Sequence, residues 1–373
     1  MNSKKLGVVV MLIVFALLTV AAIVWSNRDK QGEVQAAKNA QAQADASKPM
    51  LCLIGSEKEG FFQDPRTIKI LQENGLPVQY EKQGSREMAL RADLNKYDCA
   101  FPSGVPSAMA IKASSKVKDI YPVFFTPLVI ASWTDLVKPL TSAGIVKKSG
   151  STYYVSNMSK LLTMVDQGKR WKDLPDNEKF SVSRSIYLSS TDPAKSNSGQ
   201  MYVALASYVA NADKVVSSPA EVTAVIPLVQ KLFTDQGYME VSSQGPFADY
   251  MTMGMGKAPM VLAYESQFIE VALKNPAVTK TRVLLYPQPT VFTKHILVPF
   301  TSRGDALGKL LSTNPALRKI AVEYGFRTDD VAQFNQDVVS KMPFVPSEIL
   351  DVAEPPTFDV LEALLKQLSD VRK

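Results

Sequence analysis

Three serines close three successive β-like runs in the first third of the chain. The runs and their serines are 50–56 with Ser56, 77–85 with Ser85, and 97–104 with Ser103. A hydroxyl in such a turn most simply caps the helix that follows. In an open α/β sheet, however, the carboxyl ends of the strands meet at one edge, where helix N-termini offer free N–H groups to a ligand. Three serines at one edge therefore favour a binding site.

A second group of small polar residues lies in the segment STDPAKSNSG, residues 190–199. We expect a strand to end near Ser189 and a helix to start after Gly199, with Ser196, Asn197 and Ser198 just before it. Backbone N–H groups at the positive end of a helix dipole suit a carboxylate or an oxyanion. The alternative is an ordinary capped helix, and this stretch alone favours neither.

An apolar run at 259–266 ends in Tyr264 and Glu265. A phenol hydroxyl and a carboxylate at the end of a strand are placed to face a cleft. An edge position in the core would explain Tyr264 equally well.

Two cysteines precede two of the serine turns. Cys52 and Cys99 each lie four residues before a strand-end serine, so they would be nearly level on neighbouring parallel strands. A disulfide is conceivable there, but level neighbours in a parallel sheet have poor geometry for a bridge. Two buried free thiols are at least as good an interpretation.

Catalysis and metal binding have little support in the sequence. His295 is the one imidazole, and general acid–base or triad chemistry would depend on it. One histidine and two cysteines cannot build a zinc site without carboxylates. We therefore expect no enzyme, no metal and no cofactor.

The elements that would position these residues alternate between strands and helices. Helical periodicity at 65–74, 86–95 and 219–236 lies among the β-like runs, which is typical of βαβ units. The sequence therefore predicts an α/β fold. The formal net charge is +6 with 21% charged residues, yet the chain has no block of five or more Lys or Arg, so nucleic acid is not an expected partner.

The N-terminus predicts a membrane anchor. Residues 7–25 contain no charge, and a run of about 20 apolar residues spans a bilayer. The run is too long for a signal peptide and lacks an A-x-A site after it. We expect a single transmembrane helix at 7–25, preceded by a short N-terminal segment at 1–6 and followed by a flexible linker at 26–48 rich in Ala, Gln and Lys. Flanking charges are balanced and leave the orientation open.

The strand-end turns, STDPAKSNSG, the strand ending at Tyr264 and the late strand HILVPF (295–300) together resemble the type II periplasmic solute-binding proteins, the receptors of ABC importers. The resemblance covers most of residues 49–330. It implies two α/β lobes joined by two crossing strands, with ligand between them. It assigns 49–130 to lobe one, 131–294 to lobe two, and 295–373 to the return into lobe one with the C-terminal helices.

The same resemblance implies a location and a site. Because the family is exported, it places residues 1–6 on the cytoplasmic side of the membrane and the part after the anchor outside the cytoplasm. Oxyanion binders of the family use serines and amides of the first turns, a helix start and a tyrosine. The residues that match these features, or lie beside them, are Ser56, Ser85, Ser103, Ser196, Asn197, Ser198, Gly199, Tyr264 and Glu265. Glu265 would repel a bare anion unless it points away.

We therefore expect a membrane-tethered, extracytoplasmic binding protein for a small polar ligand, inorganic anions included, which serves a membrane permease. The alternative is a sensor or interaction module with the same fold in a membrane complex.

Overall fold

The computed structural model describes residues 48–370. The predicted membrane helix at 7–25, and all of the predicted linker except Lys48, lie outside this range. Across residues 48–370, no helix combines the length and the apolar character that a membrane crossing requires.

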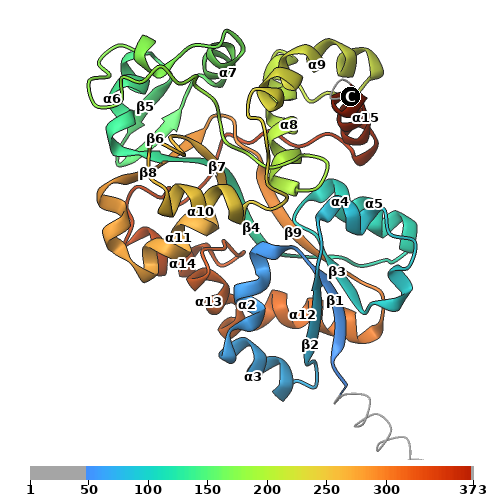
Figure 1. The fold of residues 1–373 in the computed structure, drawn as a ribbon. Helices are drawn as coiled ribbons and strands as arrows, with labels where there is room; N and C mark the ends of the chain where they lie inside the picture. The colour runs from blue at the N-terminus through green and yellow to red at the C-terminus, as the bar shows by residue number, and fades with distance from the viewer. Residues whose placement is uncertain (1–47, 371–373) are drawn as a thin grey trace, which may run out of the picture.

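The helices and strands gather into two bodies, here called lobe one and lobe two (Figure 1), and the buried apolar side chains form two clusters in each. The clusters of lobe one include Ile54, Phe101 and Phe124. The clusters of lobe two include Leu128, Leu205 and Phe268. The division falls within one strand, between Phe124 and Leu128, so the two lobes share that strand.

Lobe one is built on three parallel strands. β1 (Met50–Ile54) lies between β2 (Val78–Lys82) and β3 (Cys99–Phe101). β1 and β3 are almost fully buried, which explains their unbroken apolar sequence. The three predicted strands are confirmed. The helices of this lobe are η1 (Ser56–Lys58), α2 (Glu59–Gln63), α3 (Pro65–Glu73), α4 (Ser85–Ala89), η2 (Leu94–Lys96), α5 (Val105–Ser115), α12 (Ser302–Thr313) and α13 (Pro315–Glu323).

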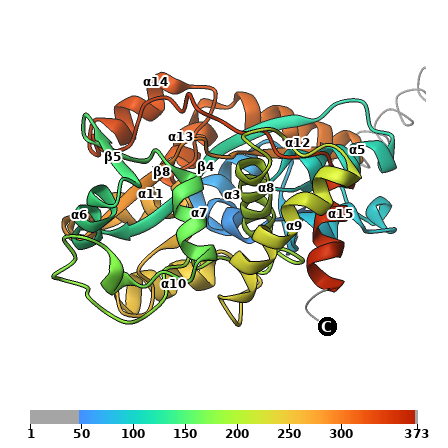
Figure 2. The same ribbon diagram turned by 90° about the horizontal axis from the view of Figure 1, so that it is seen from above.

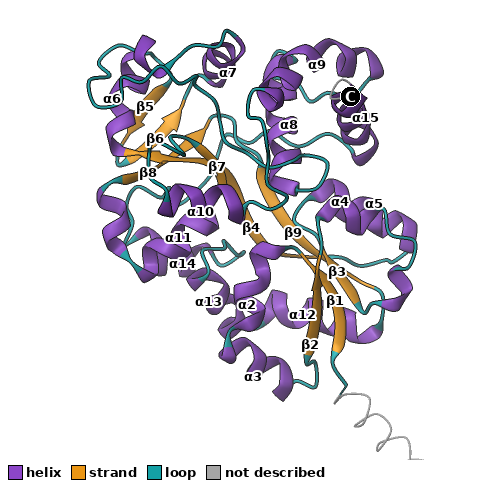
Figure 3. Cartoon of the chain, viewed as in Figure 1, coloured by secondary structure: helices purple, strands orange, loops and turns teal. Residues whose placement is uncertain are grey.

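Two strands connect the lobes. β9 (Phe292–Pro299) pairs antiparallel with β3 and with residues 121–127 of β4 (Tyr121–Trp133). Residues 128–133 of β4 pair instead with strands of lobe two. β4 therefore runs from the sheet of one lobe into that of the other (Figure 3).

Lobe two continues the sheet and covers it with helices. Its other strands are β5 (Val146–Ser149), β6 (Thr152–Val155), β7 (Val261–Tyr264) and β8 (Arg282–Pro287). Its helices are α6 (Thr134–Ser142), α7 (Met158–Asp166), η3 (Trp171–Asp173), α8 (Asn197–Ala210), α9 (Pro219–Thr234), α10 (Gln244–Thr252), α11 (Glu265–Lys274) and η4 (Pro276–Lys280). The α/β class expected from the sequence is confirmed.

The C-terminal segment returns to lobe two. It contains α14 (Val331–Phe334), a π-helical turn (Asn335–Val339) and α15 (Phe358–Asp370). Four leucines of α15 are buried in the same cluster as α8 and α9, and α15 lies beside α9 in both ribbon views (Figures 1 and 2). The sequence-based division had placed this segment with lobe one, and the lobe boundaries stay a prediction.

Two local predictions were wrong. The segment before Ser189 forms no strand, and it meets the sheet only at an isolated bridge between Ser189 and Val261. Helix α8 begins at Asn197 and not after Gly199, so Asn197, Ser198 and Gly199 form its first turn. The cause is packing, because Gly199 has no Cβ and lets Pro193 and the carbonyl of Thr191 lie against the helix.

Candidate functional site

A cleft of about 340 Å³ lies where the two lobes meet. Lobe one lines it with the turns that follow β1, β2 and β3, and lobe two lines it with the start of α8, the loop before α10 and the end of β7. The lining residues are Gly55, Ser56, Glu57, Lys82, Gln83, Gly84, Ser85, Glu87, Ser103, Lys195, Ser196, Asn197, Val241, Ser242, Ser243 and Tyr264.

The turns of lobe one hold one another in place. The backbone N–H of Ser103 donates to Ser85 Oγ at 2.9 Å, which joins the turn after β3 to the turn after β2. Both serines are buried. Because Ser85 Oγ uses an acceptor lone pair in this bond, its own hydrogen stays available to the cleft.

Polar contacts cross the cleft and close it. Ser56 Oγ and Ser242 Oγ lie 3.0 Å apart. Asn197 Nδ2 donates to the carbonyl oxygen of Ser103 at 3.1 Å and to the hydroxyl of Tyr264 at 3.0 Å. Asn197 thereby ties the first turn of α8 both to lobe one and to the end of β7.

A buried charged cluster forms the floor of the cleft. Lys58 Nζ donates to Glu57 Oε1 at 2.5 Å, to Ser103 Oγ at 2.9 Å and to His295 Nδ1 at 3.0 Å. Ser103 Oγ in turn donates to Glu57 Oε1. Glu57 and Lys58 come from the turn after β1, whereas His295 comes from the crossing strand β9.

Burial and charge set the ionisation of this cluster. Burial lowers the pKa of His295 to about 4, and the neighbouring Lys58 ammonium adds to the effect. Burial would raise the pKa of the Glu57 carboxyl, but Lys58 and His295 outweigh it and hold the pKa well below its ordinary value. Burial also lowers the pKa of Lys58, against the attraction of Glu57. At neutral pH, His295 is therefore uncharged and accepts from Lys58, which places its proton on Nε2.

Six of the nine residues expected at the site line the cleft: Ser56, Ser85, Ser103, Ser196, Asn197 and Tyr264. The other three do not. Ser198 Oγ contacts the hydroxyls of Thr191 and Ser196 at 2.8 and 3.0 Å and holds the loop. Gly199 packs against that same loop.

Glu265 points away from the cleft. Its carboxylate accepts from Arg327 Nε at 2.7 Å and Nη2 at 2.9 Å, and from the Tyr286 hydroxyl at 2.8 Å. All three side chains are buried. The carboxylates that line the cleft are instead Glu57, whose side chain is 8% exposed, and the exposed Glu87, and the sequence reasoning missed both.

The acidic and basic residues of the turns gave no signal in the sequence. In the sequence, Glu57, Lys58 and Glu59 look like an ordinary run of solvent-exposed charges. The structure differs from that expectation because the Lys58 side chain is buried, at 0% exposed. Within residues 48–370, no group of three or more His, Cys, Asp or Glu side chains is placed to hold a metal ion.

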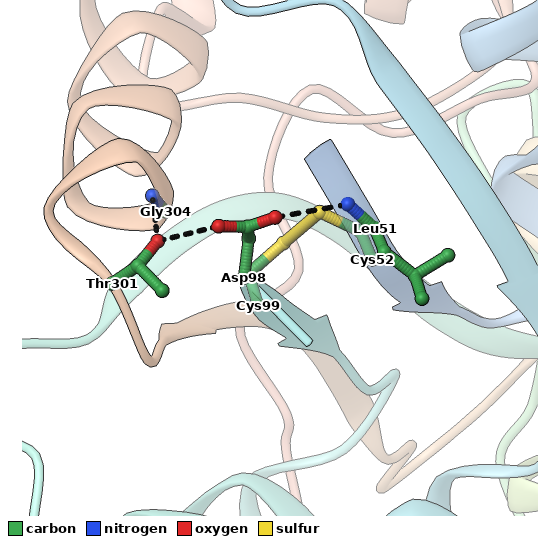
Figure 4. Close-up of a disulfide and its surroundings, with 6 residues drawn as sticks. All are labelled: Leu51, Cys52, Asp98, Cys99, Thr301 and Gly304. Carbon is green, nitrogen blue, oxygen red and sulfur yellow. Dashed lines mark hydrogen bonds between the residues drawn. A yellow bond between two sulfur atoms is a disulfide. The ribbon is translucent and has the colours of Figure 1, made fainter. Parts of the chain in front are cut away.

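Cys52 and Cys99 form a disulfide, so the first of the two interpretations is correct (Figure 4). The two residues are paired on β1 and β3 with their Cα atoms 4.9 Å apart. Beside the bridge, the Asp98 carboxylate accepts from the backbone N–H of Leu51 at 3.0 Å and the Thr301 hydroxyl at 2.7 Å (Figure 4). The strands that carry the turns of Glu57 and Ser103 are thus cross-linked.

Comparison with known proteins identifies the fold. The chain matches no family model and no curated protein. Among solved structures, it is similar to the periplasmic binding protein AfuA of Actinobacillus pleuropneumoniae with fructose-6-phosphate bound, at 13% identity and a TM-score of 0.52, over 86% of this chain and 98% of that one.

Two further structures give the same result. An ABC transporter solute-binding protein of Thermotoga lettingae bound with α-D-tagatose matches at 14% identity and a TM-score of 0.52, over 87% of this chain and 94% of that one. The apo ferric ion-binding protein A of Pasteurella haemolytica matches at 10% identity and a TM-score of 0.50, over 87% and 98%. The chain has the type II fold of the periplasmic solute-binding proteins, as the resemblance implied.

Proposed function

We propose that this chain is an extracytoplasmic solute-binding protein that captures a small polar ligand between its lobes and delivers it to an ABC-type importer in the membrane. The observation that carries the proposal is the cleft itself. Nine hydroxyl or amide side chains from both lobes line one cavity of about 340 Å³, and small-molecule sites have volumes of about 300–1,000 Å³.

The fold supports a binding role but does not select the ligand. The solved neighbours were crystallised with a phosphorylated sugar or a ketose, or are named for ferric ion. Proteins that share a fold differ in their sites. The ligand class must therefore come from the residues of this cleft.

The disulfide supports the proposed location. Stable disulfides form in oxidising compartments such as the periplasm and are rare in the cytosol. Cys52 and Cys99 are both buried and bonded. Together with the uncharged run at 7–25, this favours a domain tethered outside the cytoplasm by a single helix.

Thermal unfolding with added ligands tests the proposal. A ligand at a hundred times its Kd stabilises the folded chain by about 2.7 kcal/mol. We expect such a shift for residues 48–370 with one class of small polar compound. The Ser56→Tyr variant, which fills the cleft, should lose the shift, and Ser151→Tyr in the exposed turn between β5 and β6 should keep it. A shift that survives Ser56→Tyr would contradict binding at this cleft.

Co-purification separates transport from sensing. The full chain, extracted from membranes in mild detergent, should carry an importer permease with it. Recovery of a signalling protein in place of a permease would favour the sensor interpretation of the same fold.

A further inference from the structure

One oxygen of the Glu57 carboxylate has no protein partner. Oε1 accepts from Lys58 Nζ and Ser103 Oγ and lies 3.4 Å from His295 Nδ1. Among residues 48–370, no donor contacts Oε2. The side chain is 8% exposed and lines the cleft, so we take this oxygen to be an acceptor that is open to the ligand space.

The neighbouring donors already have acceptors and do not donate to Glu57 Oε2. The three hydrogens of the Lys58 ammonium are directed at Glu57, Ser103 and His295. The Ser103 hydroxyl has one hydrogen, which it donates to Oε1. A ligand that displaces water from the cleft leaves Oε2 without a donor unless it supplies one itself, and an unsatisfied carboxylate oxygen is unfavourable.

The lysines near the cleft do not neutralise the Glu57 carboxylate on the side that faces the ligand. Lys58 lies behind Glu57 and is not among the lining residues. Lys82 Nζ donates to Glu59 at 2.9 Å, which draws it towards α2. Lys195 is exposed at the rim. The buried charge that a ligand meets first is therefore negative.

We infer that the cleft selects a hydroxylated small molecule of the sugar or polyol class, whose hydroxyl donates to Glu57 Oε2, and that it rejects acceptor-only oxyanions such as sulfate and molybdate. This inference rests on the proposed function and makes Glu57 a specificity-determining residue. The remaining lining hydroxyls, which both donate and accept, suit the same class of ligand. The cavity of about 340 Å³ also has the size of an organic-ligand site.

Two measurements on the wild-type chain test the inference. Small molecules released by denaturing the full chain, freshly extracted from membranes in mild detergent, are identified by mass spectrometry, and we expect a hydroxylated organic compound. In thermal unfolding, D-fructose, D-glucose, myo-inositol and fructose 6-phosphate form one group, with sodium sulfate and sodium molybdate as the other. We expect stabilisation by a member of the first group and none by the second.

The outcomes distinguish an error in the ligand class from an error in the proposed binding function. Stabilisation by sulfate or molybdate alone, or their release from the purified protein, would overturn the ligand class and leave a binding function in place. No released compound and no stabilisation by either group would overturn the proposed function itself.

The Glu57→Gln variant tests the residue. It removes the negative charge and leaves the Lys58 ammonium without its counter-ion, so affinity for the hydroxylated ligand should fall at least tenfold and sulfate should begin to stabilise the chain. The control is Asp64→Asn, which neutralises another buried, ion-paired carboxylate of lobe one, outside the cleft. It should keep wild-type selection. If Glu57→Gln does not fold, the two wild-type measurements still decide the ligand class.

Discussion

Arg86 and Glu362 join the two lobes at the edge of the cleft. Arg86 Nε and Nη2 donate to the two carboxylate oxygens of Glu362 at 2.5 and 2.7 Å. Arg86 follows Ser85 in a cleft-lining turn of lobe one, whereas Glu362 belongs to α15, whose leucines are buried in lobe two. The pair is a bidentate contact between lobes, separate from the two crossing strands.

We expect Glu362→Gln to loosen α15 without unfolding either lobe. The side chains are 26% and 27% exposed, and a partly exposed pair contributes about 0.5–1 kcal/mol. Amide hydrogens of α15 should therefore exchange about two- to fivefold faster, while those of β1 stay unchanged. The matched control is Glu270→Gln, which breaks a surface pair with Lys274 inside one helix. Equal rates in α15 for both variants would contradict an interlobe role.

Gly84 sets how closely the lobes approach. A Cβ at this position would collide with the backbone oxygen of Lys195 in lobe two. The φ angle of Gly84 is −65°, so alanine is compatible with the local backbone. We expect Gly84→Ala to keep the unfolding temperature within about 2 °C and to weaken ligand binding about tenfold or more, because the lobes cannot close fully.

Small-angle scattering gives an independent measure of that effect. The radius of gyration of Gly84→Ala should be larger than that of the wild type. Gly256→Ala is the control, since a Cβ there would meet nothing within 4 Å. An unchanged radius together with wild-type affinity would show that the contact does not limit closure.

His295 should make the chain less stable in mild acid. The pKa of His295 in the folded chain is about 4, against an ordinary value of 6.5. Between these values the unfolded chain binds a proton that the folded chain does not, so the free energy of unfolding falls as the pH falls from 6.5 towards 4. The full loss is about 3 kcal/mol. Urea unfolding at pH 7.0, 6.0 and 5.0 measures this loss.

The His295→Asn variant isolates the effect, because the chain has one histidine. The asparagine oxygen can still accept from Lys58, and the slope between pH 7.0 and 5.0 should flatten. A variant that keeps the wild-type slope would assign the acid sensitivity to carboxyl groups instead.

Reduction of the Cys52–Cys99 bridge should lower stability. The bridge closes a loop with a sequence separation of 47, for which the chain-entropy model gives about 3–4 kcal/mol. Urea unfolding of oxidised and reduced protein measures the difference, with the Cys52→Ala, Cys99→Ala double variant unaffected by reductant. Two titratable thiols in unreduced, denatured protein would show that the bridge is absent.

The sequence predicted the serine turns well and the charged floor poorly. Ser56, Ser85 and Ser103 line one cleft because strand ends of a parallel sheet share an edge, and that rule depends only on local pattern. Glu57 could not be assigned in the same way. Its partner His295 lies 238 residues later in the chain, and only the path of β9 brings the two together.

Packing between distant segments explains the other differences. The start of α8 was shifted because Thr191 and Pro193 fold back on Gly199, a contact that helix propensity does not report. The position of α15 against α9 depends on matching apolar faces. An apolar helix face in a sequence predicts that the face is buried, but it does not predict which element covers it.

The direction of the three parallel strands also determines how a tethered molecule would face its surroundings. Their carboxyl ends carry the cleft-lining turns, so their amino ends, including Met50 at the start of β1, lie on the opposite side of lobe one (Figure 1). The proposed anchor would therefore attach at the rear of the molecule. Ligand could reach the opening without passing the point of attachment, and a permease in the same bilayer would be met only after the domain turns on its linker.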